Sequence, residues 1–264
     1  MLGLHRGATR LGGLAAGLIA AAALGCATPG GPAPEQDPAR RARVHYDLGV
    51  DHLRSGRPEM AIVELERALA LRPGDAWTHV ALAEAYRQKE HRGKAEQHLR
   101  EALRIAPGHQ PARLNLSALY IEMNRFEEAI AEAERLVADP TFPAPWRALT
   151  NLGWAQFKLG RLAEARTTFQ RALDRNPQYW PALLDLGILE SDAGNRMRAL
   201  ELFRQVVEIS TVPSARAEAN YRIAEVFIAL GNRERAIPHL SAAAEQLPES
   251  EWGRKSEAYL EILR

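Results

Sequence analysis

Small and large apolar residues recur along most of the chain with a period of 34 to 37 positions. In each unit an alanine is preceded, twelve positions earlier, by a small residue that follows a leucine or an isoleucine. A period of this length that occurs six times predicts a stack of repeated structural units. The alanines are Ala61, Ala95, Ala129, Ala165, Ala199 and Ala236, and the earlier small residues are Gly49, Ala83, Ser117, Gly153, Gly187 and Ala224.

This pattern resembles the tetratricopeptide repeat, in which pairs of helices stack into a superhelix. Small residues let the two helices of a pair approach closely, and leucines fill the space between pairs. Proline ends several units because its ring clashes with the preceding helical turn and it lacks an N–H donor. The expected fold is an all-α tetratricopeptide-repeat superhelix of six helix pairs with a C-terminal capping helix. The expected repeats are 42–75, 76–109, 110–143, 146–179, 180–213 and 217–250, with the cap at 250–264 and the whole solenoid at 41–264.

Two connections are longer than the others. Residues 139–145 add two positions before the fourth pair, and residues 210–216 add three before the sixth. The first connection either divides the superhelix into two stiff blocks or is a neutral surface insertion.

The first 25 residues predict a secretory signal peptide, with a basic start followed by an apolar run that is too short for a lasting membrane span. The residues that end in Cys26 resemble the lipobox of bacterial lipoproteins, which implies acylation of the Cys26 thiol. The alternative is an ordinary secreted protein with a chance cysteine. Residues 26–40 contain four prolines and two glycines and predict an unfolded tether. By resemblance to enteric lipoproteins, Ala27 after the cysteine favours the periplasmic face of the outer membrane.

The composition and the motifs argue against catalysis and against nucleic-acid binding. The formal net charge is +1, which gives no basic stripe for a phosphate backbone. The chain contains no phosphate-binding glycine loop, no metalloprotease helix motif and no nucleophile elbow. His45, His52 and His79 have no carboxylate or thiol set beside them, so they predict packing between helices and no metal site. We therefore expect a non-enzymatic, monomeric protein without a cofactor.

In the tetratricopeptide family the fifth, ninth and twelfth places of each unit face a concave groove. Most of these places are large and apolar in this chain, and an exposed apolar patch of that kind typically marks a binding site. The alternatives are a tight superhelix whose residues cover one another, or a dimer. A clamp for chaperone C-terminal carboxylates is disfavoured because its Lys, Arg and Asn donors are largely missing. The predicted groove residues, with Trp77 at a second place, are Tyr46, Val50, Leu53, Trp77, Val80, Leu114, Ile121, Trp154, Phe157, Leu184, Ile188, Tyr221 and Ile228.

The lipobox, the tether, the six repeats and the terminal helix together resemble the type IV pilus pilotins of the PilF/PilW/Tgl family. The stretch 142–160 is the most particular match, with the longer connection placed before the fourth unit. The resemblance implies a lipid-anchored protein that binds outer-membrane secretin subunits and promotes their assembly into the pilus pore. The alternatives are a lipoprotein scaffold for peptidoglycan hydrolases or synthases, and a subunit of an envelope polysaccharide machine.

Overall fold

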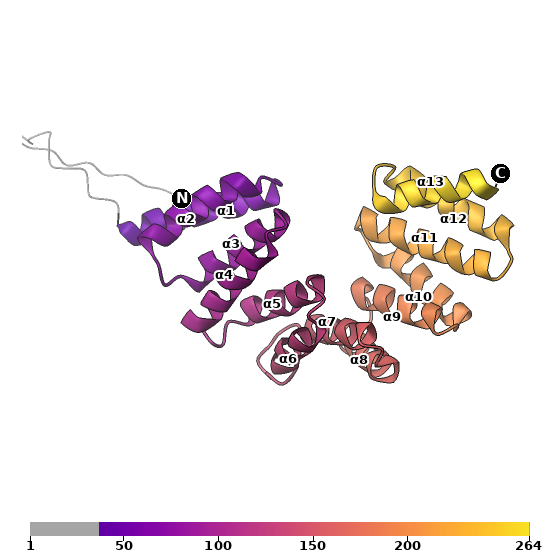
Figure 1. The fold of residues 1–264 in the computed structure, drawn as a ribbon, viewed down its shortest axis with the longest axis horizontal. Helices are drawn as coiled ribbons and strands as arrows, with labels where there is room; N and C mark the ends of the chain where they lie inside the picture. Colours follow the sequence, from indigo (N-terminus) through magenta and orange to yellow (C-terminus); the bar gives the residue numbers. More distant parts are fainter. Residues whose placement is uncertain (1–36, 264) are drawn as a thin grey trace, which may run out of the picture. The chain divides into compact units, whose positions relative to one another are not determined.

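A computed structural model describes residues 37–263, which form one compact unit built of thirteen α-helices (Figure 1). The expected all-α fold of six helix pairs and a capping helix is confirmed. The helices are α1 (Pro38–Arg54), α2 (Pro58–Leu71), α3 (Ala76–Gln88), α4 (Arg92–Ile105), α5 (Gln110–Glu122), α6 (Phe126–Val137), α7 (Pro145–Lys158), α8 (Leu162–Arg175), α9 (Trp180–Asp192), α10 (Arg196–Ile209), α11 (Pro213–Ala229), α12 (Arg233–Gln246) and α13 (Glu251–Leu263).

Small residues on the first helix of a pair lie directly against a large side chain of the second helix. A Cβ atom added to Gly187 on α9 would lie 2.5 Å from the ring of Phe203 on α10. Gly153 meets Phe169 in the same way, and Gly49 meets Leu65. All three large side chains are fully buried. The recurring small places are therefore the points of closest approach within pairs, as the sequence predicts.

The connection at 139–145 does not divide the stack. Phe142 is buried together with Leu114 and Leu136, so the connection forms part of the core between the third and fourth pairs. The side-chain amide of Gln110 donates a hydrogen bond of 2.7 Å to the carboxylate of Asp139. The alternative of two stiff blocks is therefore wrong, and the added residues fill a joint that is itself packed.

Two helices begin earlier than the sequence suggested. The first begins at Pro38, so residues 38–40 belong to the solenoid and not to the tether; the remainder of the expected tether lies outside the described residues. Asp37 caps this helix by accepting a hydrogen bond of 3.1 Å from the backbone N–H of Ala39. The sixth pair begins at Pro213, so the extra residues expected in a connection lengthen α11. Proline suits the first turn of a helix because no partner exists there for its missing N–H.

Histidines take part in packing between the helices of a pair. His45 Nδ1 lies 2.6 Å from a carboxylate oxygen of Glu64, and His79 Nδ1 lies 3.0 Å from His98 Nδ1. Tyr86 stacks on His98 with ring centroids 5.4 Å apart. Burial, with a smaller contribution from the neighbouring His79, lowers the pKa of His98 to about 4. Burial also lowers the pKa of His79. Both rings of the pair are therefore neutral at pH 7, so one imidazole donates its Nδ1–H to the other.

Candidate functional site

The first helices of the pairs form the concave side of the stack. Each first helix contacts the next one, from α1 to α3 and onward to α11, and α11 contacts α13. Within residues 37–263 no second helix contacts another second helix. Helices on the inside of a curved stack approach one another while those outside separate, so the first helices line the inner face (Figure 1).

Two aromatic rings of α7 lie at the centre of this concave face. The ring centroids of Trp154 and Phe157 are 5.4 Å apart, with the planes tilted by 52°. The ammonium group of Lys158 lies 5.5 Å from the Trp154 ring. Both rings are half-buried and pack against the core of the C-terminal pairs. They combine a fixed orientation with an accessible surface, which is what an aromatic binding anchor requires.

Three isoleucines continue this apolar surface onto the neighbouring first helices. Ile121 lies on α5, Ile188 on α9 and Ile228 on α11, and each is half-buried. We call Ile121, Trp154, Phe157, Ile188 and Ile228 the apolar stripe. Its members occupy ninth and twelfth places of their units, the places that the repeat is expected to direct to the concave face.

The fifth places do not belong to this surface in the later units. Leu114, Leu184 and Tyr221 are only 5%, 7% and 6% exposed, and their prediction as groove residues is wrong. Leu114 is buried with Leu136 and Phe142, and Leu184 is buried in the core of the C-terminal pairs. The clearest case is Tyr221, whose ring lies 5.2 Å from that of Trp252 and 6.0 Å from that of Tyr259, both on α13.

At the N-terminal end of the stack the predicted residues remain partly accessible. Val50, Leu53 and Val80 are half-buried against the core of the N-terminal pairs. Trp77 is 53% exposed and meets the ring of His109 edge-on, with centroids 4.5 Å apart. This indole is among the most exposed large apolar side chains of the described residues.

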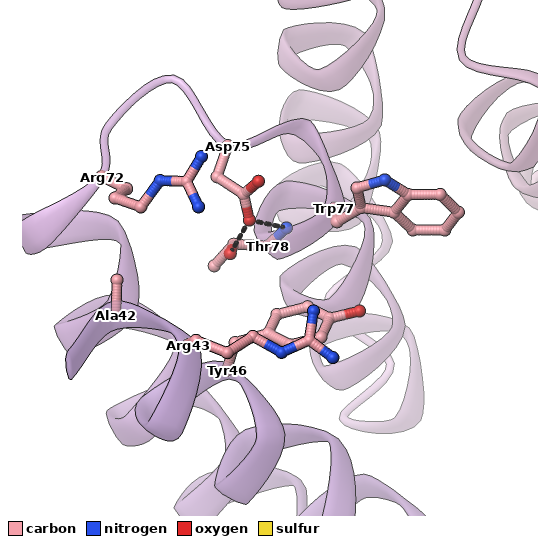
Figure 2. Close-up of a pocket in the computed structure, with 7 residues that line it drawn as sticks. All are labelled: Ala42, Arg43, Tyr46, Arg72, Asp75, Trp77 and Thr78. Atoms are coloured by element: carbon pink, nitrogen blue, oxygen red, sulfur yellow. Dashed lines mark hydrogen bonds between the residues drawn. The ribbon is translucent and has the colours of Figure 1, made fainter. Parts of the chain in front are cut away.

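A cavity of about 170 Å³ opens beside Trp77, between the start of α1 and the turn that joins α2 to α3 (Figure 2). The guanidinium of Arg43 lies 5.3 Å from the centroid of the Tyr46 ring. Asp75 caps α3, because its carboxylate accepts hydrogen bonds from the backbone N–H of Thr78, at 3.0 Å, and from the Thr78 hydroxyl. The cavity could hold one side chain of a partner. It is lined by Ala42, Arg43, Tyr46, Arg72, Asp75, Trp77 and Thr78.

Charged residues separate this end of the concave face from the apolar stripe. The guanidinium of Arg87 donates two hydrogen bonds to Glu84, at 2.9 and 2.8 Å, and one of 3.0 Å to Glu122 on the next first helix. The pair of Glu84 and Arg87 follows from their ninth and twelfth places in the sequence. The bond to Glu122 depends on the spacing of α3 and α5, which sequence reasoning did not supply. Glu84, Arg87 and Glu122 line a cavity of about 380 Å³. Asn115 and Arg147 line this cavity as well.

The lipidation site predicted at Cys26 lies outside the described residues. Within 37–263 no three His, Asp or Glu side chains gather as metal ligands. In the same range no helix has the length and hydropathy needed to cross a membrane.

Comparison with known proteins identifies the repeat and two similar pilus proteins. A family model described as tetratricopeptide repeat matches residues 114–179 and 184–251, and a second model with the same description matches residues 41–108. The type IV pilus assembly protein PilF of Pseudomonas aeruginosa is 29% identical over 177 residues, which are 65% of this chain and 69% of PilF.

Two solved structures share the fold. The crystal structure of PilW, described as a widely conserved type IV pilus biogenesis factor, superposes with a TM-score of 0.70 at 26% identity. That match covers 81% of this chain and 97% of PilW. The structure of Pseudomonas aeruginosa PilF superposes with a TM-score of 0.67 at 21% identity, over 84% of this chain and 99% of PilF.

Proposed function

The chain belongs to the tetratricopeptide-repeat proteins, and we propose that it is a non-enzymatic, lipid-anchored assembly factor of type IV pilus biogenesis. In this proposal the protein is held at the periplasmic face of the outer membrane by acylated Cys26. Its concave face binds subunits of the secretin, the outer-membrane pore of the pilus, and promotes their assembly. No covalent bond is made or broken, and the mechanism is binding at a membrane.

The observation that carries the proposal is the similarity to PilW, which extends over nearly all of the PilW chain. The similarity to PilF in both sequence and fold supports the same process. The apolar stripe adds a physical reason. A membrane-protein subunit exposes apolar surface before insertion, and contact with Trp154, Phe157 and the three isoleucines would shield that surface from water.

Replacing Trp154 and Phe157 by serine is expected to abolish secretin binding by the concave face. Aromatic anchors typically contribute about 2 kcal/mol or more each, so losing both costs about 4 kcal/mol and should weaken binding about a thousandfold. The measurement is recovery of secretin with the tagged full chain from detergent-solubilised membranes, together with the yield of secretin multimers.

The matched control replaces Leu162 and Met197 by serine. These side chains are exposed on the second helices α8 and α10, so the control removes two apolar groups outside the concave face. Helicity and melting temperature are compared first, because Trp154 and Phe157 also contact the core. A folded groove variant that still assembles secretin normally would refute the proposal. Recovery of peptidoglycan enzymes in place of secretin would favour the scaffold alternative.

Replacing Cys26 by alanine is expected to leave unprocessed precursor that no longer fractionates with the outer membrane. The sulfur atom of the Cys26 thiol would carry the lipid. Alanine removes that sulfur and leaves the residues of the solenoid unchanged. Immunoblotting of separated membrane fractions, with incorporation of a radiolabelled fatty acid, measures the effect. Normal processing and unchanged fractionation of this variant would disprove the lipoprotein assignment.

A further inference from the structure

A further cavity, of about 330 Å³, lies on the outer side of the stack between the second helices α4 and α6. Second helices do not contact one another in the range 37–263, so a cleft opens between these two, and the first helix α5 forms its floor. The buried side chains of Leu116 and Tyr120 belong to this floor. The cleft is therefore separate from the concave face and from the apolar stripe.

Four arginines line this cleft. Arg100 and Arg104 lie on α4, Arg113 on α5 and Arg135 on α6. Among the described residues, Glu132 supplies the only carboxylate that lines the cleft with them. Four guanidinium groups around one carboxylate give the cleft a positive potential, which attracts an anionic guest.

One arginine is fixed at the floor and a second shares its carboxylate. The guanidinium of Arg113 donates a hydrogen bond of 2.6 Å to Glu132 and one of 2.8 Å to the backbone oxygen of Pro107. Arg135 donates a bond of 2.7 Å to the same Glu132, and its side chain is 63% exposed. Glu132 is thus divided between two cations, and the outer one remains open to solvent.

The two arginines of α4 are also open to solvent. The side chains of Arg100 and Arg104 are 68% and 72% exposed. Arg104 pairs with Glu101 at 2.6 Å. Arg100 lies 3.5 Å from Glu96, a carboxylate that already accepts a hydrogen bond of 2.6 Å from Arg125. A guanidinium has five N–H donors, so both groups retain donors for an anion from outside.

The repeat does not require arginine at these four places. The equivalent places of the preceding joint, between α2 and α4, hold Glu66, Ala70, His79 and Glu101. Those of the following joint, between α6 and α8, hold Glu134, Ala138, Leu149 and Arg171. Both of these joints pack helix pairs without a set of arginines. The charge at the joint of α4, α5 and α6 is therefore additional to what the fold needs.

We propose that the cleft between α4 and α6 binds an extended acidic segment of a partner protein. Arg100 and Arg104 are one helical turn apart, about 6 Å along α4. Alternate side chains of an extended segment point the same way and are about 6.6 Å apart, so two of its carboxylates can meet both guanidinium groups at once. A single phosphate or lipid head group would engage one place only. This inference does not rest on the proposed function, because it uses the outer side of the stack.

The test uses a short fluorescein-labelled peptide in which glutamate alternates with alanine, and a second peptide with glutamine in place of every glutamate. Fluorescence anisotropy measures the binding of both to the full chain in micelles of an uncharged detergent. The native chain should prefer the glutamate peptide about tenfold. Raising the salt concentration from about 50 to about 300 mM should reduce this preference several-fold, because exposed charge pairs are screened.

Arg100→Gln combined with Arg104→Gln should abolish the preference, so that the two peptides bind almost equally. The melting temperature should change little, because exposed ion pairs contribute little to stability. A purely structural role would instead lower the melting temperature and leave the preference for glutamate in the folded fraction.

The matched control combines Arg67→Gln on α2 with Arg198→Gln on α10. These exposed arginines pair with carboxylates three residues away on second helices, as Arg104 does, but they lie outside the cleft. The control removes the same net charge and should keep the preference for glutamate.

The inference is overturned if the native chain binds both peptides equally, or if the control lowers the preference as much as the change in the cleft. Phosphatidylglycerol added to the micelles, or inorganic phosphate in solution, should not displace the glutamate peptide at an equal concentration of charge. Displacement by either would assign the cleft to a phosphate group and overturn the acidic segment. Recovery of secretin remains a separate readout, so this inference and the proposed function can fail independently.

Discussion

Replacing Phe203 by alanine is expected to lower the free energy of unfolding by about 3–5 kcal/mol. Phe203 on α10 is fully buried within the core of the C-terminal pairs. Its ring fills the space left by Gly187 on α9, so its removal leaves a void at the closest approach of the two helices. Urea denaturation of the full chain, followed by circular dichroism, measures the loss.

The same contact predicts a coupling between Phe203 and Gly187. Gly187→Ala should destabilise the native chain, because the new methyl would lie 2.5 Å from a ring that is fully buried and has no room to move. In the Phe203→Ala background the methyl instead fills part of the void, and alanine favours the helix by up to about 1 kcal/mol. Equal effects of Gly187→Ala in the two backgrounds would show that the ring and the glycine do not form a packing unit.

The pairing of helices could be predicted from the sequence because it depends on contacts that recur in every unit. Gly49, Gly153 and Gly187 each meet one large side chain on the following helix, and the period alone assigns them to one role. Helix starts were harder to predict, since Pro38 and Pro213 look like linker residues. Proline in a first turn and proline in a tether share one preferred backbone angle, and only the surrounding structure distinguishes them.

The candidate site could be predicted only in part. The ninth and twelfth places gave the apolar stripe, because these positions face the groove whatever lies next in the stack. The fifth places failed at Leu114, Leu184 and Tyr221, since their exposure depends on the element that follows, such as α13 over Tyr221.

Replacing Gly253 by alanine is expected to detach the capping helix α13 at a cost of about 1–3 kcal/mol. The added Cβ would lie 2.0 Å from the backbone oxygen of Leu247 and 2.7 Å from that of Pro248. Backbone atoms cannot turn aside as a side chain can, so α13 must shift as a whole. Hydrogen exchange should show faster exchange of the α13 amides, and the total tryptophan fluorescence should shift to longer wavelength as the Trp252 ring becomes exposed.

Gly93→Ala on α4 is the control for this change, because a Cβ at Gly93 meets no atom within 4 Å. That variant should be unchanged or more stable by up to about 1 kcal/mol, since alanine favours a helix over glycine. Detachment of α13 would uncover the Tyr221 ring and separate the Arg222 guanidinium from the Trp252 ring. If the α13 amides of the Gly253→Ala variant exchange as slowly as in the native chain, the close approach at Gly253 is not needed to hold the cap.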